Sequence, residues 1–188
     1  MKRDIILAGV GGQGILSIAA VIGMAAVESG MYLKQAEVHG MSQRGGAVQS
    51  HLRISDRPIA SDLIPEGECD MILSVEPMEA LRYLPFLAEE GWVVSSTKTF
   101  QNIDNYPGEE ALFSEIKKIE NHILIDASEI ARKLGSRKVS NIVMLGAASR
   151  YLGLSMEGLE GALRSLFGRK GDEIVQMNIE ALRAGQTA

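Results

Sequence analysis

The chain has 188 residues, with 19 Lys and Arg against 24 Asp and Glu, a formal net charge of −5 and a single cysteine. Its length fits one compact domain over residues 1–188, since domains run from roughly 50 to 250 residues. The lone Cys69 excludes a disulfide framework, a Cys-rich structural zinc site and a four-thiolate iron–sulfur cluster on this chain. With 5% aromatic residues and net acidity, it also lacks the basic face and stacking platform of a typical nucleic-acid binder, so no nucleic-acid partner is expected.

The N-terminal part contains an uncharged stretch, residues 5–27, that is long enough to span a bilayer. Four glycines and Gln13 interrupt this stretch where a signal peptide or a membrane anchor, the alternative interpretation, should be continuous. We therefore predict a buried strand over residues 5–10, a tight turn, and a helix over residues 15–29 that ends at Gly30. The chain is expected in the cytoplasm with no membrane partner.

Short apolar runs alternate with helical patterns along the rest of the chain. They predict strands over residues 33–38, 47–54, 71–75, 92–95 and 122–125. They predict helices over residues 77–87 with a break at Pro85, and over 110–120, 126–134, 141–152, 156–167 and 172–184, with Asp126 and Ser155 as N-caps. Residues 97–109 are polar and irregular, with turn chemistry at residues 105–108.

The order of these elements favours an α/β fold. We predict a three-layer Rossmann-like domain with a mostly parallel, mixed sheet and helices on both faces. The strand over residues 47–54 follows the previous strand after a short loop, so it should run antiparallel, and its alternating pattern suggests a sheet face open to polar surroundings.

A first glycine block, residues 9–14 (GVGGQG), satisfies the G-x-G-x-x-G fingerprint between a strand and a helix. Such a turn lets backbone N–H groups at the helix start approach a phosphate or carboxylate. Glu37, near the end of the second predicted strand, lies where a ribose-binding acid belongs. One interpretation is therefore an autonomous NAD- or flavin-binding domain, and the other is a turn that only lets the helix pack closely on the sheet.

A second block, residues 37–46 (EVHGMSQRGG), places three glycines and one cation between two strands. Arg44 can offer a bidentate fork to a carboxylate or phosphate, and Gly45 and Gly46 can turn N–H groups toward the same anion. The alternative is a hairpin loop with a solvated Arg44. His39 is a candidate proton carrier or hydrogen-bond donor, but the three histidines, His39, His51 and His122, lie on different elements, so no metal site is predicted.

These two blocks, followed by residues 48–55 (VQSHLRIS), resemble the gamma-type domain of the 2-oxoacid:acceptor oxidoreductases. The E-V-H-G-M-S-Q-R-G-G form of the second block is typical of the indolepyruvate branch of that family. Residues 77–81 (PMEAL) and Asn141 with Leu145 and Gly146 are similar to later family segments, so the resemblance covers nearly the whole chain.

The resemblance implies a subunit of an enzyme that decarboxylates aryl pyruvates oxidatively and passes electrons to ferredoxin. The thiamine diphosphate, the Mg and the [4Fe-4S] clusters are expected on a large alpha subunit, CoA acts as co-substrate, and this chain holds no cofactor tightly. By the same resemblance, the candidate catalytic residues are His39 and Arg44, and the cofactor-binding residues are Gly11, Gly12, Gln13, Gly14, Ser42, Gln43, Arg44, Gly45 and Gly46. A non-catalytic scaffold remains an alternative, and the isolated chain is expected to be able to dimerise through the surface meant for its partner.

Overall fold

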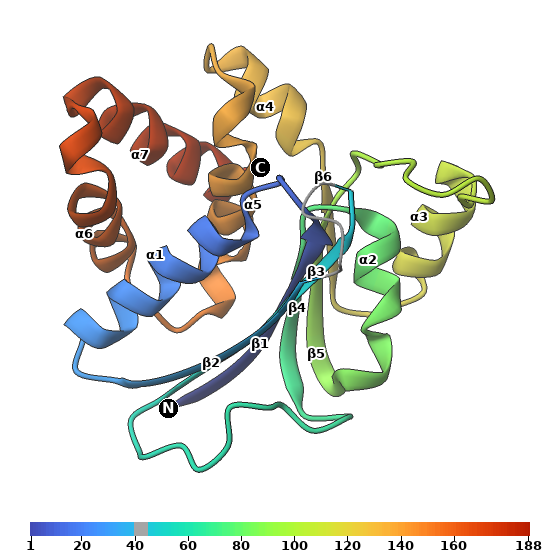
Figure 1. The fold of residues 1–188 in the computed structure, drawn as a ribbon, viewed down its shortest axis with the longest axis horizontal. Coiled ribbons are helices and arrows are strands. Elements are labelled where there is room, and N and C mark those ends of the chain that lie inside the picture. Colours follow the sequence, from blue (N-terminus) through green and yellow to red (C-terminus); the bar gives the residue numbers. More distant parts are fainter. Residues whose placement is uncertain (40–44) are drawn as a thin grey trace.

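The computed structural model describes residues 1–39 and 45–188, and for His39 the backbone only. One mixed sheet of six strands forms its centre, in the order β2-β3-β1-β4-β5-β6 (Figure 1). The strands are β1 (Lys2–Val10), β2 (Tyr32–His39), β3 (Ala47–Ser55), β4 (Cys69–Ser74), β5 (Leu87–Ser96) and β6 (His122–Ile125). β3 runs antiparallel to both of its neighbours, β2 and β1, while β1, β4, β5 and β6 pair in parallel.

Helices cover both faces of the sheet. They are α1 (Ile15–Glu28), α2 (Pro77–Arg82), α3 (Glu109–Lys117), α4 (Ala127–Lys133), α5 (Ser140–Ala148), α6 (Met156–Phe167) and α7 (Asp172–Gln186). Because side chains alternate along a strand, Ile5 and Leu7 of β1 pack under α1, α5, α6 and α7, while Ile6 and Ala8 pack under α2 and α3. Figure 1 shows these two helical layers on opposite sides of the sheet. The predicted α/β fold is confirmed.

Local signals explain how several helices begin. Asp126 Oδ1 accepts a hydrogen bond from Glu129 N at 2.8 Å, and Ser155 Oγ accepts one from Gly158 N at 3.0 Å. Both are the N-caps that the sequence predicts, and each satisfies an otherwise unpaired N–H group of the first helical turn. The predicted break at Pro85 is also confirmed, since α2 ends at Arg82 and a short 3-10 turn, Leu84–Phe86, follows it.

Helices α5 and α7 touch at two glycines. An added Cβ on Gly146 would lie 2.0 Å from Leu182 O, and one on Gly185 would lie 1.9 Å from Val143 O. Only residues without a side chain allow this approach, so the Leu-Gly pair that resembles a family segment has a packing function here.

Three expectations need correction. The polar face of β3 is not open, because residues 56–68 cover it: His51 is 5% exposed and accepts a hydrogen bond from Ile64 N at 3.0 Å, and Arg53 donates to Leu63 O at 2.8 Å. β5 begins at Leu87 rather than at residue 92, since Leu87 already pairs with Cys69 of β4, ahead of a register shift that brings Trp92 opposite Met71. The predicted helix over residues 141–152 ends at Ala148 and continues only as a 3-10 turn, Ser149–Tyr151.

No helix in the described part of the chain is long and apolar enough to cross a membrane.

Candidate functional site

The first glycine block forms the turn between β1 and α1, at the edge of the sheet where the parallel strands end. Gly14 is the N-cap of α1 with φ of 80°, a left-handed conformation that favours glycine. The side-chain oxygen of Gln13 accepts a hydrogen bond from Val10 N at 2.7 Å and so closes the turn on itself. This bond leaves the Gln13 amide NH₂ as the group that a ligand can meet.

Two close contacts fix the position of this turn. A Cβ on Gly9 would lie 2.5 Å from Val75 Cγ2 and 2.8 Å from Ile15 Cδ1, so the backbone passes between β4 and α1. A Cβ on Gly14 would lie 2.6 Å from Asn141 Nδ2, and this amide donates to Gly14 O at 3.1 Å. Asn141, which the sequence links to the family only by motif, therefore ties α5 to the start of α1.

The second glycine block meets the first through the backbone. Gly11 N donates to Gly46 O at 2.8 Å, although the two residues lie far apart in the sequence. Of the predicted site residues, Gly11, Gly12, Gln13 and Gly14 are thus brought together with Gly45 and Gly46. Ser42, Gln43 and Arg44 lie outside the described residues, as does the side chain of His39, whose backbone ends β2.

A third segment, which the sequence suggests only as a surface excursion, completes this edge. Asn102 Nδ2 donates to Gly45 O at 2.8 Å, while the buried Oδ1 of Asn102 has no hydrogen-bond partner in the described part of the chain. Residues 97–108 therefore return to the second glycine block. We call the turn of residues 11–14, Gly45 with Gly46, and residues 98–102 together the carboxyl-edge site.

A fully buried carboxylate holds the third segment in place. Glu76 is the N-cap of α2, two residues after the end of β4, and its two oxygens accept hydrogen bonds from Glu79 N at 2.8 Å, from Phe100 N at 3.3 Å and from the hydroxyl of Tyr106. Burial, and then this bond to Glu76, raise the pKa of Tyr106, so the phenol stays protonated and remains a donor. The sequence offers little signal for Glu76, because glutamate is an unusual N-cap.

A cavity of about 80 Å³ lies between the ends of these strands. Its lining comes from the segments that follow β1 and β4, from the end of β5 and the segment after it, from the first turn of α4 and from α5, namely Gln13, Val75, Ser96, Lys98, Ala127, Ser128, Ser140 and Met144. Lys98 is exposed and forms no ion pair with any described residue, and three serines line the same cavity. Crevices outside the carboxyl ends of parallel strands are where open α/β sheets bind ligands. The donors here, an ammonium, an amide and hydroxyls, suit a small anion.

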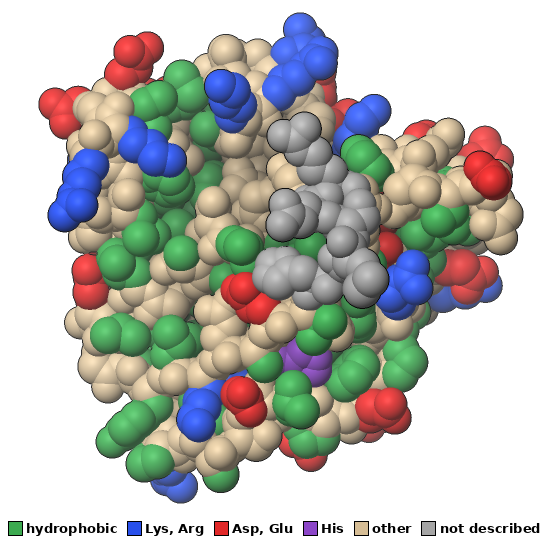
Figure 2. All heavy atoms as spheres, viewed as in Figure 1, with side chains coloured by type: hydrophobic (Ala, Val, Ile, Leu, Met, Phe, Trp, Pro, Cys, Tyr) green, Lys and Arg blue, Asp and Glu red, His purple; other side chains and the backbone are tan. Residues whose placement is uncertain are grey.

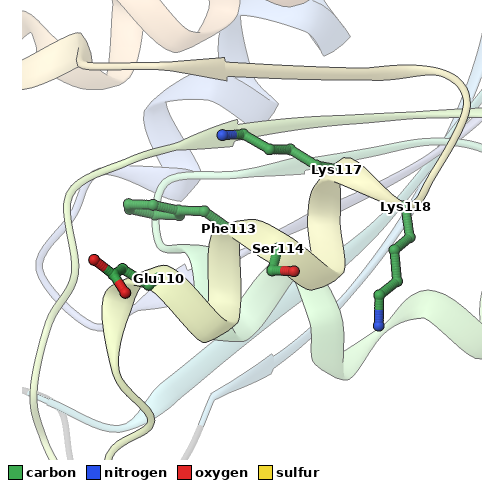
Figure 3. A pocket seen from close by; sticks show the side chains of 5 residues that line it. All are labelled: Glu110, Phe113, Ser114, Lys117 and Lys118. Atoms are coloured by element: carbon green, nitrogen blue, oxygen red, sulfur yellow. The ribbon is translucent and has the colours of Figure 1, made fainter.

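A larger recess, of about 480 Å³, lies along α3 but has a different character. All five residues that line it belong to α3 or its end, and Figure 3 shows Lys117 and Lys118 pointing in different directions. Lys118 Nζ forms an ion pair with Glu115 Oε1 at 2.6 Å. Side chains of one helix that diverge do not form a site for a specific ligand.

Cys69 and His122 have structural roles. Burial raises the pKa of Cys69 to about 12, and its thiol donates to Met71 O at 2.9 Å, so it remains an unreactive thiol. His122 Nδ1 lies 2.6 Å from Ile119 O. Within residues 1–39 and 45–188, no three His, Cys, Asp or Glu side chains gather as ligands for a metal ion.

The strand order argues against an NAD site of the usual kind. In that arrangement the acidic residue ends the strand next to β1, beside the glycine turn. Here β3 separates β2 from β1, and Glu37 pairs in register with Ser50 of β3. The Gly11 N–H, which would face a pyrophosphate, is bonded to Gly46 O instead.

Comparison with known proteins decides the family. Residues 4–188 match the model of the pyruvate ferredoxin/flavodoxin oxidoreductase family. The chain belongs to that family. It is 37% identical over 194 residues to the indolepyruvate oxidoreductase subunit IorB of Archaeoglobus fulgidus, covering 98% of this chain and 94% of that protein. The IorB subunit of Methanothermobacter thermautotrophicus is 34% identical, with 98% and 96% of the two chains covered.

Solved structures of oxidoreductases share the fold. The pyruvate oxidoreductase subunit PORC of Thermotoga maritima superposes with a TM-score of 0.76 at 22% identity, over 99% of this chain and 96% of that one. The 2-oxoglutarate:ferredoxin oxidoreductase of Magnetococcus marinus, with 2-oxoglutarate, coenzyme A and succinyl-CoA bound, superposes with a TM-score of 0.78 at 23% identity. This chain matches only 30% of that longer chain. The family match and the similarity to the two IorB subunits confirm the resemblance that the two glycine blocks indicate.

Proposed function

We propose that this chain is the small subunit of a 2-oxoacid oxidoreductase of the indolepyruvate type, and that residues 1–188 form one gamma-type domain whose carboxyl-edge site faces the active site of a larger subunit. The similarity to two IorB subunits over almost the full chain supports the substrate class, an aryl 2-oxoacid. The observation that carries the site is the bond from Gly11 N to Gly46 O, which joins the two family blocks at one edge.

The larger subunit supplies the cofactors in this proposal. It holds thiamine diphosphate, Mg and [4Fe-4S] clusters, which decarboxylate the 2-oxoacid and pass its electrons to ferredoxin, while CoA accepts the acyl group. This chain cannot hold such a cluster, because its one cysteine is buried and protonated. A fold relative from Magnetococcus marinus contains coenzyme A, which supports CoA as the co-substrate. The complex works in the cytoplasm, a reducing compartment in which the free Cys69 is stable.

In this arrangement, the chain's own residues position anions and exclude water. Gln13, through its NH₂ group, and Lys98, through its ammonium, donate to an anionic group of a ligand held mainly by the partner. Arg44 supplies a further bidentate donor from the second block, and His39 of the same block acts as a hydrogen-bond donor or proton carrier.

Substitution of Arg44 in the co-expressed complex tests this role. Arg44→Ala should raise KM for the 2-oxoacid or for CoA about tenfold with assembly intact, the effect of losing a charge-assisted hydrogen bond of about 1.4 kcal/mol. Arg44→Lys should restore only part of that loss, because an ammonium cannot form the fork.

Arg150→Ala is the matched control. Arg150 is exposed and follows α5 next to Tyr151, whose carbonyl accepts a hydrogen bond from Arg3 near the start of β1, so it lies away from the carboxyl-edge site. Unchanged KM values for both substrates in Arg44→Ala would remove the ligand role, and full activity of every carboxyl-edge variant would favour a scaffold.

A further inference from the structure

A third recess, of about 290 Å³, opens beside the carboxyl-edge site among four helices. Its lining comes from α1, α5, α6, α7 and the turns between them: Ser17, Ser136, Lys138, Val139, Asn141, Phe167, Lys170, Ile174, Met177 and Asn178. We call it the helix-layer pocket. Asn141, which anchors the Gly14 turn, lines this pocket, whereas Ser140 and Met144 of the same helix line the smaller cavity.

The pocket combines an apolar wall with two cations. Phe167, Ile174, Met177 and Val139 supply the wall, and Lys138 and Lys170 supply the charge. No acidic residue lines it, and neither lysine forms an ion pair with any residue in the described ranges, although Lys170 Nζ lies 5.1 Å from the centre of the Phe167 ring. Figure 2 shows Lys and Arg side chains over α4 and α7 on this face, with Asp and Glu side chains at the outer end of α7. The acidic pair there, Asp172 and Glu173, does not line the pocket.

Polar groups inside the recess remain available as well. Asn178 lines the pocket, is 7% exposed and uses its Nδ2 to donate to Ile174 O at 2.7 Å. Ser17 also lines the recess, and its hydroxyl makes no hydrogen bond within residues 1–39 and 45–188. A few polar groups on a mostly apolar wall are typical of a small-molecule site.

We propose that the helix-layer pocket binds an organic anion with a flat apolar body, whose ring lies against Phe167 and Met177 and whose negative group lies between Lys138 and Lys170. Lysine ammonium groups act as point charges toward phosphates and carboxylates alike. The volume lies near the lower end of the range for ligand pockets, about 300–1,000 Å³, and so suits one ring system rather than a whole dinucleotide. The proposal concerns this chain alone and does not depend on the partner subunit.

Calorimetric titration of the full chain tests it with two probes that share this chemistry. Adenosine 3′,5′-bisphosphate represents a phosphorylated ring, and indole-3-acetate represents an aryl carboxylate. At least one should bind, and the one that binds more tightly identifies the source of the anion. If neither probe gives a heat of binding at millimolar concentration, the proposal is overturned.

Three variants locate the binding. Lys138→Ala and Lys170→Ala should each weaken it about fivefold, the factor that corresponds to a charge pair of about 1 kcal/mol. Lys133→Ala is the control, because this exposed lysine belongs to α4 and does not line the pocket. Ser17→Met keeps both charges but fills the recess with a good helix former, and it should abolish binding. Equal losses in Lys133→Ala, or full binding by Ser17→Met, place the probe elsewhere and refute the assignment.

Discussion

Replacing Gly14 by alanine tests whether contact with α5 holds the turn after β1. Gly14 has φ of +80°, and a Cβ there would lie 2.6 Å from Asn141 Nδ2. Gly12 provides the matched control, because its φ is +98° and a Cβ there would meet nothing within 4 Å. The two positions share the backbone strain and differ in the contact.

The free energies of unfolding follow from these contacts. An L-residue in the left-handed region costs about 1–2 kcal/mol, and the stiffer unfolded chain offsets about 0.4–1 kcal/mol of that. Gly12→Ala should therefore lower the free energy of unfolding by about 1 kcal/mol. Gly14→Ala also displaces the Asn141 amide from Gly14 O, at a further cost of about 1–3 kcal/mol for a buried group that loses its partner.

Urea unfolding followed by circular dichroism measures both variants, together with Asn141→Ala and the double variant Gly14→Ala with Asn141→Ala. We expect Gly14→Ala to cost at least about 1 kcal/mol more than Gly12→Ala, and this excess to vanish once Asn141 is truncated. Equal losses for the two glycine variants, or an excess that persists without Asn141, would refute the reasoning.

Three further predictions concern the frame around the site. Glu76→Gln should lower the free energy of unfolding in urea by about 1.5–3 kcal/mol and speed proteolysis within residues 97–108, because an amide replaces one acceptor oxygen of a fully buried carboxylate. An unchanged rate of cleavage would contradict this prediction. Gly146→Ala should lower the melting temperature markedly, since its Cβ would lie 2.0 Å from Leu182 O, while Gly168→Ala, with nothing within 4 Å, should not. Burial lowers the pKa of His51 below 6.5. As pH falls through that value, His51 becomes protonated in the unfolded chain but not in the folded chain, so the free energy of unfolding decreases. His51→Asn should therefore flatten the loss of unfolding free energy between about pH 7 and about pH 5, and an equally steep loss in both proteins would contradict this.

The sequence predicts the elements whose signals are local. The continuous apolar run of β1 predicts a strand that is buried on both faces of the sheet. Asp126 and Ser155 are predicted as N-caps because their side chains can accept a hydrogen bond from an N–H group that the first helical turn leaves unpaired. The antiparallel direction of β3 follows from the short connection before it.

The sequence does not predict features that depend on distant contacts. The cover over His51 comes from a long irregular connection whose path no periodicity describes. Glu76 becomes a buried acceptor only when residues 97–108 fold back over it, and Asn102 reaches Gly45 only through the same return. The two glycine blocks can be recognised in the sequence from their composition. The hydrogen bond between Gly11 and Gly46 cannot, because it depends on the pairing of β1 with β3.

The central claim is that this chain is one half of a 2-oxoacid oxidoreductase. The most direct measurement is CoA-dependent reduction of a viologen dye by indolepyruvate, with the purified large subunit in the presence and in the absence of this chain. The account predicts reduction only when both subunits are present, and loss of that activity when the carboxyl-edge site is altered. Full activity of the large subunit alone, or no activity of the assembled pair with any aryl 2-oxoacid, would contradict it.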